Sequence, residues 1–377
     1  MSMPRSASSE PVSSPGSPIL NILVWLIAFL LYAATTARDI LPADSGEFQL
    51  IAAGWGVGHP PGYPLYTVIA ALWVRLVPLG TIPFRVNLLS AGLAATALVL
   101  CMSAVQAWAY LLGTPRKTSV IGGLLTALAL GTAATFWAQA TTANIRMPTM
   151  LFASWGYLAL ARYQAAQGHA RQQDRALVAL ALATGLGVGH HPSLAFIAVG
   201  WGVTLLLLRS GLLRSPSRWV RPAIVAAMAW FIPQLYLVLR GSVATAPLSP
   251  GDLATWQGFW DHVLARGFGG DMFAFAGVED LALRLPLMPS LFRMQFAPVI
   301  LVASGLSWLL ILTRDRPLAI ALFVPWIVQS FVTITYRAPQ TIEYLMPSYI
   351  PMALSLGIGV GLLRAQLVSR PAGRDNV

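Results

Sequence analysis

Two carboxylates, Asp44 and Glu47, stand three positions apart shortly after the first long apolar run of the chain. Pro42 precedes them and an apolar stretch begins at position 48, so the pair fits the start of a helix with Asp44 as its N-cap. Capping alone is one explanation of the pair. The other is catalytic, because a carboxylate at a membrane surface, partly removed from water, can take a proton from an attacking hydroxyl or amide. The two roles are compatible, since a capping carboxylate is held rigid.

Residues 58–66 form a second polar motif, Gly-His-Pro-Pro-Gly-Tyr-Pro-Leu-Tyr. Three prolines and two glycines in so short a stretch cannot continue a helix and require a defined turn. A rigid turn flanked by aromatic residues is more typical of the wall of a site than of a linker. His59 and Tyr63 are therefore candidate substrate-binding residues.

Four further polar residues stand where long apolar runs begin or end. Arg85 and Asn87 open one run, and Arg240 and Arg337 close two later runs. An arginine at such a position usually anchors a helix at the membrane interface, but a fixed guanidinium also matches phosphate oxygens. Asn87 is explained equally well by a hydrogen bond between helices. All four are candidates for substrate binding, with these structural roles as the alternative.

His190 and His191 form a pair directly before Pro192, between two short apolar runs. Adjacent histidines point apart and no third ligand is evident nearby, so a proton relay, an imidazole facing a phosphate or a tight polar turn explains the pair better than zinc. The single cysteine, Cys101, allows neither a disulfide within the chain nor a cysteine-based metal site. The sequence has no P-loop, dinucleotide fingerprint or His-Glu-x-x-His motif. We therefore expect no cofactor, while a divalent metal ion is allowed but not indicated.

Membrane helices must position these residues. Of the 377 residues, 56% are hydrophobic and 10% are charged, and the mean hydropathy is +0.68. Soluble domains carry about a quarter charged residues, so a soluble enzyme and a disordered chain are both excluded. Long apolar blocks also exclude an outer-membrane barrel, whose strands alternate in short runs. The net charge of +11 is explained by arginines in cytoplasmic loops rather than by nucleic-acid binding.

The sequence predicts an all-α polytopic membrane protein with about ten transmembrane helices and both termini in the cytoplasm. This topology places most of the 24 basic residues inside and most of the 13 acidic residues outside, as the positive-inside rule requires. It breaks the chain at the histidine pair and makes 57–79 a re-entrant or interfacial segment. The predicted spans are the apolar runs at 19–37, 86–112, 118–139, 147–161, 176–189, 193–208, 223–239, 294–313, 317–336 and 344–363.

Three regions follow along the chain. They are a disordered cytoplasmic tail at 1–18, a membrane module at 19–240 with a first outer loop at 38–85, and a region at 241–377 with the second outer loop and three more helices. Long ordered loops in compact proteins are usually functional. The second outer loop, to position 293, is rich in Trp and Phe and fits either an amphipathic helix on the membrane surface or core packing.

Three motifs together resemble the signature of a known family. They read Asp-Ser-Gly-Glu-Phe at 44–48, Gly-Val-Gly-His-Pro-Pro-Gly-Tyr-Pro-Leu-Tyr at 56–66 and Phe-Arg-Val-Asn-Leu-Leu-Ser at 84–90. The family consists of bacterial integral membrane proteins of unknown function and is similar to a eukaryotic transmembrane protein O-mannosyltransferase. Weaker matches continue at 135–140, 185–191, 235–240 and 343–347.

The resemblance implies a GT-C-type glycosyltransferase of the bacterial inner membrane. Such an enzyme moves a sugar, here a mannose-like hexose, from a polyprenyl-phosphate carrier to a protein or envelope-glycan acceptor on the outer side, with the outer loops or a partner protein presenting the acceptor. Asp44 would be the general base and Glu47 would orient the substrate or tune Asp44. The carrier phosphate would need donors in the low-dielectric membrane. The candidate substrate-binding residues are His59, Tyr63, Arg85, Asn87, His190, His191, Arg240 and Arg337.

One motif departs from the family pattern. Residues 143–146 read Ala-Asn-Ile-Arg, where many relatives have an acidic residue followed by an aromatic one. A non-catalytic assembly factor that binds the lipid carrier is therefore an alternative. A transporter or flippase of a lipid-linked solute is another, although transporters usually place ionisable residues near mid-membrane, and here they cluster at span ends and in outer loops.

Overall fold

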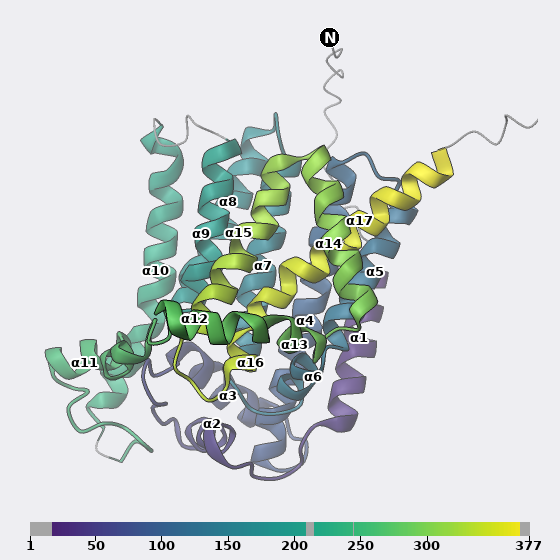
Figure 1. Ribbon diagram of the computed structural model, residues 1–377. Helices are drawn as coiled ribbons and strands as arrows, with labels where there is room; N and C mark the ends of the chain where they lie inside the picture. The colour runs from purple at the N-terminus through teal and green to yellow at the C-terminus, as the bar shows by residue number, and fades with distance from the viewer. Residues whose placement is uncertain (1–16, 209–214, 244, 370–377) are drawn as a thin grey trace, which may run out of the picture.

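The fold is a bundle of long helices (Figure 1). The computed structural model describes residues 17–208, 215–243 and 245–369, and within these ranges it contains helices and no β-strand. In the described chain, five helices are long and apolar enough to cross a membrane, and the number is seven if each of two bent helix pairs counts as one span. The predicted all-α, multi-pass architecture is confirmed. The five single helices long and apolar enough to cross a membrane are α1 (Pro18–Thr35), α4 (Ile82–Leu111), α10 (Pro216–Gly241), α15 (Arg316–Thr335) and the stretch Thr341–Leu367, which contains α16 (Thr341–Tyr344) and most of α17 (Tyr349–Ser369).

Each of the ten apolar runs lies on a helix or a bent helix pair, but the count of ten spans stays a prediction. The chain breaks at the histidine pair, as expected. The short helix after this break is 15 residues long, or about 22 Å, which is less than the ~30 Å of a hydrocarbon core. The predicted tail at 1–18 lies almost wholly outside the described residues. The remaining runs lie on α5 (Arg116–Gly131) with α6 (Ala134–Ala140), α7 (Arg146–Ala165), α8 (Ala170–His190), α9 (Leu194–Leu208) and α14 (Pro298–Arg314).

α1 begins and α17 ends at the same end of the bundle (Figure 1), so the chain crosses it an even number of times. The turn between α14 and α15, which carries Arg314 and Arg316, lies at this end as well. The opposite end, here called the outer end, carries α2 (Ala43–Gly54), α3 (Pro64–Leu76) and α11 (Trp256–Val263). This separation agrees with the positive-inside rule. Which end faces the cytoplasm stays a prediction.

Small residues bring the central helices close together. α4 packs against α1, α5, α7 and α17. α5 and α17 cross with their backbones in contact, because a Cβ atom added to Gly122 would lie 2.2 Å from the carbonyl oxygen of Gly357. Thr126 donates a hydrogen bond across the same crossing to the carbonyl of Ala353 (2.8 Å). The bundle is thus a tightly packed support for the outer end.

The first outer loop, residues 38–85, folds into α2, α3 and the proline-rich turn between them. Phe48 and Ile51 of α2 are buried in one cluster with Tyr66 of α3 and Val86 of α4. With 13 residues, α3 is about 20 Å long and too short to cross a membrane by itself. The loop is a folded cap on the outer end, and its re-entrant or interfacial position stays a prediction.

The second outer loop is a series of short helices. Phe259 and Val263 pack inward against Leu237 of α10, whereas Trp256 and Val278 are exposed. The loop therefore has a packed face and an exposed apolar face, so each of the two sequence-based interpretations describes one side of it. After α11 come η1 (Arg266–Asp271), α12 (Val278–Arg284), η2 (Leu285–Leu287) and α13 (Met288–Arg293), and the chain then bends by 106° into α14.

Candidate active site

The acidic motif lies in the first turn of α2. The helix begins at Ala43, so Asp44 is its second residue, and the expectation that Asp44 is the N-cap is wrong. The N-cap is Pro42, whose side chain cannot cap the helix, and Ser45 ties the first turn to the segment before α7 by donating its hydroxyl to the carbonyl of Ala143 (2.8 Å). Within the described part of the chain, the Asp44 carboxylate accepts no hydrogen bond. It is therefore available to a ligand.

Glu47 holds the proline-rich turn. Its Oε1 accepts from the backbone amide of His59 (2.6 Å), and its Oε2 lies 2.9 Å from the imidazole Nδ1. Burial favours the neutral form of Glu47, but the hydrogen bonds and charge of His59 outweigh it and lower the pKa of Glu47 below its ordinary value. Burial also opposes protonation of His59, yet Glu47 raises the pKa of His59 above its ordinary value. The two side chains form an ion pair in which Nδ1–H donates to the carboxylate.

The same turn is held from its other side by the second outer loop. His262 of α11 donates from Nε2 to the carbonyl of Gly58 (3.0 Å). Gly62 has a φ of +89°, which side chains other than glycine rarely adopt, and an added Cβ would lie 3.0 Å from the His262 imidazole. The turn is thus fixed by Glu47 on one side and by His262 on the other.

Tyr63 and His191 continue the row of polar side chains. The Tyr63 hydroxyl lies 3.2 Å from Nε2 of His59, and its ring lies nearly parallel to that of His191, with 9° between the planes. Nδ1 of His191 accepts from the backbone amide of Ser193 (3.1 Å), which places the proton of a neutral ring on Nε2. Burial, followed by the charge of Arg146, lowers the pKa of His191 well below its ordinary value. His191 is therefore a neutral imidazole with one N–H to donate.

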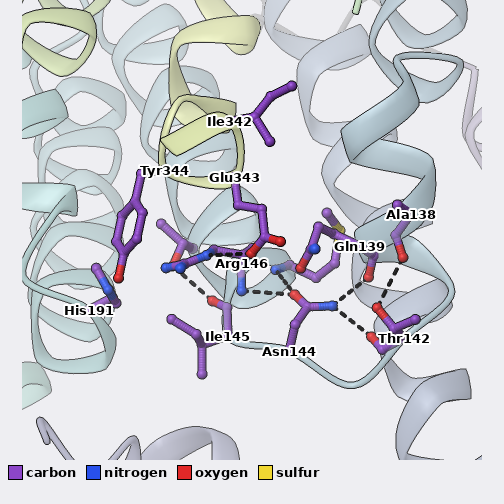
Figure 2. A network of polar contacts seen from close by, with 12 residues as sticks. Ala138, Gln139, Thr142, Asn144, Ile145, Arg146, His191, Ile342, Glu343 and Tyr344 are labelled. Atoms are coloured by element: carbon purple, nitrogen blue, oxygen red, sulfur yellow. Dashed lines mark hydrogen bonds and ion pairs between the residues drawn. The ribbon is translucent and has the colours of Figure 1, made fainter. Parts of the chain in front are cut away.

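The cationic side of the site lies at the start of α7 (Figure 2). The guanidinium carbon of Arg146 lies 3.8 Å from the centroid of the Tyr344 ring, and its Nε lies 3.6 Å from Oε2 of Glu343. Sequence reasoning missed all three residues. The signals that could have indicated them were an arginine at the very start of an apolar run and the acidic-aromatic pair that opens the 343–347 motif.

Asn144 positions Arg146 (Figure 2). Its Oδ1 accepts from the backbone amides of Arg146 (2.8 Å) and Met147 (2.9 Å), and its Nδ2 donates to the carbonyls of Gln139 and Thr142 (both 2.6 Å). A carboxylate has no hydrogen to donate to these two carbonyls. The amide that departs from the family's acidic pattern therefore has a structural role in this chain.

A cavity of about 200 Å³, open to solvent, joins the polar row to an apolar wall. A small pocket of about 10 Å³, with room for roughly one water molecule, is lined by Arg146 and Glu343 and adjoins the cavity through Ser193 and Tyr344, which border both. This arrangement suits a ligand with a polar head and an apolar chain. The polar side of the main cavity is formed by His59, Tyr63, His191 and Tyr344, and the apolar side includes Phe196, Leu264, Phe268, Met272 and Val332.

Comparison with known proteins decides the family resemblance. Residues 44–212 match the model of the protein O-mannosyl-transferase TMEM260 N-terminal domain. The mouse protein O-mannosyl-transferase TMEM260 is 27% identical over 252 residues, which are 66% of this chain and 34% of the mouse protein. Protein O-mannosyl-transferase tmem260 of Dictyostelium discoideum is 26% identical over 89 residues, which are 23% of this chain and 11% of that protein. The predicted resemblance is confirmed, and this chain spans about a third of the length of its mouse relative.

The fold is similar to that of ArnT from Cupriavidus metallidurans, solved with bound undecaprenyl phosphate. The TM-score is 0.56 at 17% sequence identity, over 92% of this chain and 60% of that chain. This likeness confirms the predicted GT-C-type fold. Glu343 and Tyr344 lie beyond the TMEM260 match, whereas the other site residues lie within it: Asp44, Glu47, His59, Tyr63, Arg146 and His191.

The three predicted interfacial arginines lie outside the cavity lining. Arg85 donates to the carbonyls of Val74, Leu79 and Gly80 in its own loop. Arg240 donates to the carbonyl of Trp55 (2.7 Å). Arg337 is bound to Asp271 (2.6 Å), with 61% of its side chain exposed. In each case the guanidinium is bonded to groups of the outer loops, and its role as an anchor at the membrane interface stays a prediction.

Asn87 and His190 lie behind the site and are fully buried. Asn87 accepts from the side chain of Gln49 (3.1 Å) and from the amide of Ala143 (2.7 Å), so it joins α2, α4 and the start of α7. The His190 ring bonds to the carbonyl of Ile145 through Nε2 (2.9 Å). Both residues support the elements that carry the site instead of lining the cavity.

Asp44, Glu47 and His59 also have the geometry of a possible metal site. Each offers one ligand atom, and the three atoms lie within 4.8 Å of one another. Metal binding through Nδ1 of His59 would replace the bond that this atom makes with Glu47. The expectation of no cofactor stays a prediction, and the metal requirement that the sequence left open stays open.

Proposed function

We propose that the protein is a membrane glycosyltransferase that takes a sugar from a polyprenyl-phosphate carrier and transfers it to a protein or envelope-glycan acceptor at the outer face of the bacterial inner membrane. The observation that carries this proposal is the cavity, whose polar side holds two imidazoles opposite an apolar wall, with the Asp44–Glu47–His59 cluster and the buried Arg146 beside it. The matches to O-mannosyl-transferases and the fold shared with ArnT support the same reaction class.

Asp44 is the proposed general base. Its carboxylate takes the proton of the acceptor hydroxyl or amide as that atom attacks the anomeric carbon, and the bond from this carbon to the phosphate oxygen breaks, so the configuration inverts. Glu47 keeps His59 and the turn in place beside Asp44. The base is therefore accessible while the residues around it are fixed.

The leaving group is the polyprenyl phosphate. Its charge has to be offset where the membrane keeps the dielectric constant low. Arg146 lines the small pocket and His191 lines the adjoining main cavity, and Arg146 with the N–H of His191 are the proposed phosphate partners. They replace Arg85, Arg240 and Arg337, whose guanidinium groups are bonded elsewhere.

The decisive experiment uses the purified full chain in detergent, a radiolabelled polyprenyl-phosphate sugar and an envelope extract. We expect label transfer by the natural sequence and a loss of at least about 100-fold with Asp44→Asn, since general base catalysis contributes that much, while donor binding persists. Asp39→Asn, on the same loop, is the matched control and should keep its activity. Transfer that survives in Asp44→Asn would refute the base assignment.

The same preparation separates the alternative functions. Carrier binding without transfer to any acceptor fraction would indicate a non-catalytic assembly factor. Movement of the labelled carrier across a vesicle membrane without a product would indicate a transporter or flippase.

A further inference from the structure

Arg146 is a buried cation that is only loosely paired. Its side chain is 9% exposed, and its Nε lies 3.6 Å from the Glu343 carboxylate, beyond the 2.7–2.9 Å of a charge-assisted hydrogen bond. A second arginine–carboxylate pair at this end of the bundle, Arg337 with Asp271, is exposed and closes to 2.6 Å. Two pairs of the same chemistry at the same end of the bundle thus differ in burial and in distance.

Glu343 is held weakly for physical reasons. It lies on α16, a helix of four residues, and 30% of its side chain is exposed. The Glu343 carboxylate is partly withdrawn from water, and its ion-pair partner Arg146 lies 3.6 Å away. A partly buried carboxylate without a close partner is poorly stabilised. It can be exchanged for a better anion at modest cost.

The guanidinium is in place for such an exchange. Tyr344 lies against its face, which keeps its plane fixed, and Asn144 fixes the backbone that carries it. Glu343 and Arg146 both line the small pocket that adjoins the main cavity. This pocket has room for roughly one water molecule, so a phosphate can reach the guanidinium only if the Glu343 carboxylate moves away.

We propose that Glu343 occupies Arg146 while the site is empty, and that a lipid phosphate displaces it on binding. Glu343 is then a positioning residue, an internal counter-ion that keeps the buried arginine neutralised between turnovers. The step is an exchange of ion pairs and involves no covalent change. The inference rests on the proposed function for the identity of the lipid, but not for the exchange itself.

The test measures binding of farnesyl phosphate to the purified full chain. We expect Glu343→Gln to bind about tenfold more tightly than the natural sequence, because the variant removes the charge that competes with the phosphate. A tenfold change in affinity corresponds to about 1.4 kcal/mol of binding free energy. Arg146→Met should lose most of the binding. Asp271→Asn, which breaks the exposed pair, is the matched control and should leave the affinity unchanged.

Two further ligands separate the sources of the affinity. Farnesol carries the chain without the phosphate and should bind equally to the natural sequence and to Glu343→Gln, whereas a difference would contradict charge exchange. Inorganic phosphate should gain affinity in Glu343→Gln if the anion alone drives the exchange. The absence of this gain, with a gain for farnesyl phosphate, assigns the site to the lipid-borne phosphate.

A tighter variant cannot be explained by damage to the fold, which makes the direction of the change decisive. If Glu343→Gln binds farnesyl phosphate weakly, Glu343→Ala tests whether the added amide is the cause, because alanine removes the charge without adding an amide. Unchanged or weaker binding of farnesyl phosphate in both variants would overturn the proposal. Tighter binding in a protein that transfers no sugar would leave the exchange standing and refute the proposed function.

Discussion

The hydrogen-bond donors of Arg85 are used by carbonyls of its own loop, whereas Arg146 has a flat aromatic neighbour and one distant carboxylate. Both residues carry the same charge and both stand at the start of an apolar run. What distinguishes them is which groups the fold places around them. At the residue scale, the function of a charged side chain here follows from its partners and not from its type.

The Glu47–His59 pair predicts a pH dependence of stability. Because the pKa of His59 is raised by folding, its contribution is complete below the unfolded value of about 6.5 and disappears as pH rises through the folded value. Because the pKa of Glu47 is lowered, its contribution is complete above the unfolded value and disappears as pH falls through the folded value. The pair therefore stabilises the turn most at mildly acidic pH.

This dependence can be measured by thermal unfolding in detergent. The difference in Tm between the natural sequence and His59→Gln should be largest near about pH 6 and shrink toward about pH 9. His169→Gln, at the start of α8 near the other end of the bundle, is the control. A difference that stays constant across this range would show that His59 acts through packing and not through its charge.

Most of the candidate site could be predicted from the sequence, including His191, and for the residues of the first outer loop the reason is local. Asp44, Glu47, His59 and Tyr63 belong to one loop, where turn residues and scarce charges are visible without knowledge of the fold. Arg146 and Glu343 come from two distant helices, α7 and α16, and meet the loop only through tertiary packing. The N-cap assignment of Asp44 is wrong because the helix begins at Ala43, directly after Pro42, so Asp44 already lies inside its first turn.

At the element scale, the position and length of an apolar run can be read from the local sequence. Each of the ten runs accordingly lies on a helix or a bent helix pair. Bends and close crossings depend on neighbours and were not predicted. α5 turns by 76° into α6, and α5 crosses α17 at a point where Gly122 and Gly357 leave no space for a side chain. These features determine where the outer end is placed relative to the bundle.

The α5–α17 crossing predicts which glycine tolerates substitution. A Cβ atom at Gly122 would lie 2.2 Å from the Gly357 carbonyl oxygen, which is backbone and cannot move aside. We expect Gly122→Ala to reduce the free energy of unfolding by about 1–3 kcal/mol, as overpacking does, with a lower Tm in detergent. Gly202→Ala in α9 is the matched control, because a Cβ atom added there would have no neighbouring atom within 4 Å. Equal Tm values would show that the two helices separate easily.

At the scale of the whole molecule, charge and shape are arranged along one axis. Basic residues such as Arg314 and Arg316 lie at the end where α1 begins and α17 ends, and the acidic motif lies at the other end. The cavity with its apolar wall is part of this outer end. A lipid-linked donor could therefore reach the site from the leaflet that borders the outer end, provided that this end faces away from the cytoplasm.

The chain itself offers a clean test of this orientation. Its single cysteine, Cys101, is fully buried and should not react with a membrane-impermeant maleimide. Trp256 of the second outer loop is 79% exposed, and Lys117 is exposed at the start of α5. In right-side-out vesicles we expect Trp256→Cys to be labelled at once and Lys117→Cys only after permeabilisation, because the positive-inside rule holds the basic end in the cytoplasm. The reverse pattern would place Asp44 in the cytoplasm, where an outward-facing carrier could not reach it.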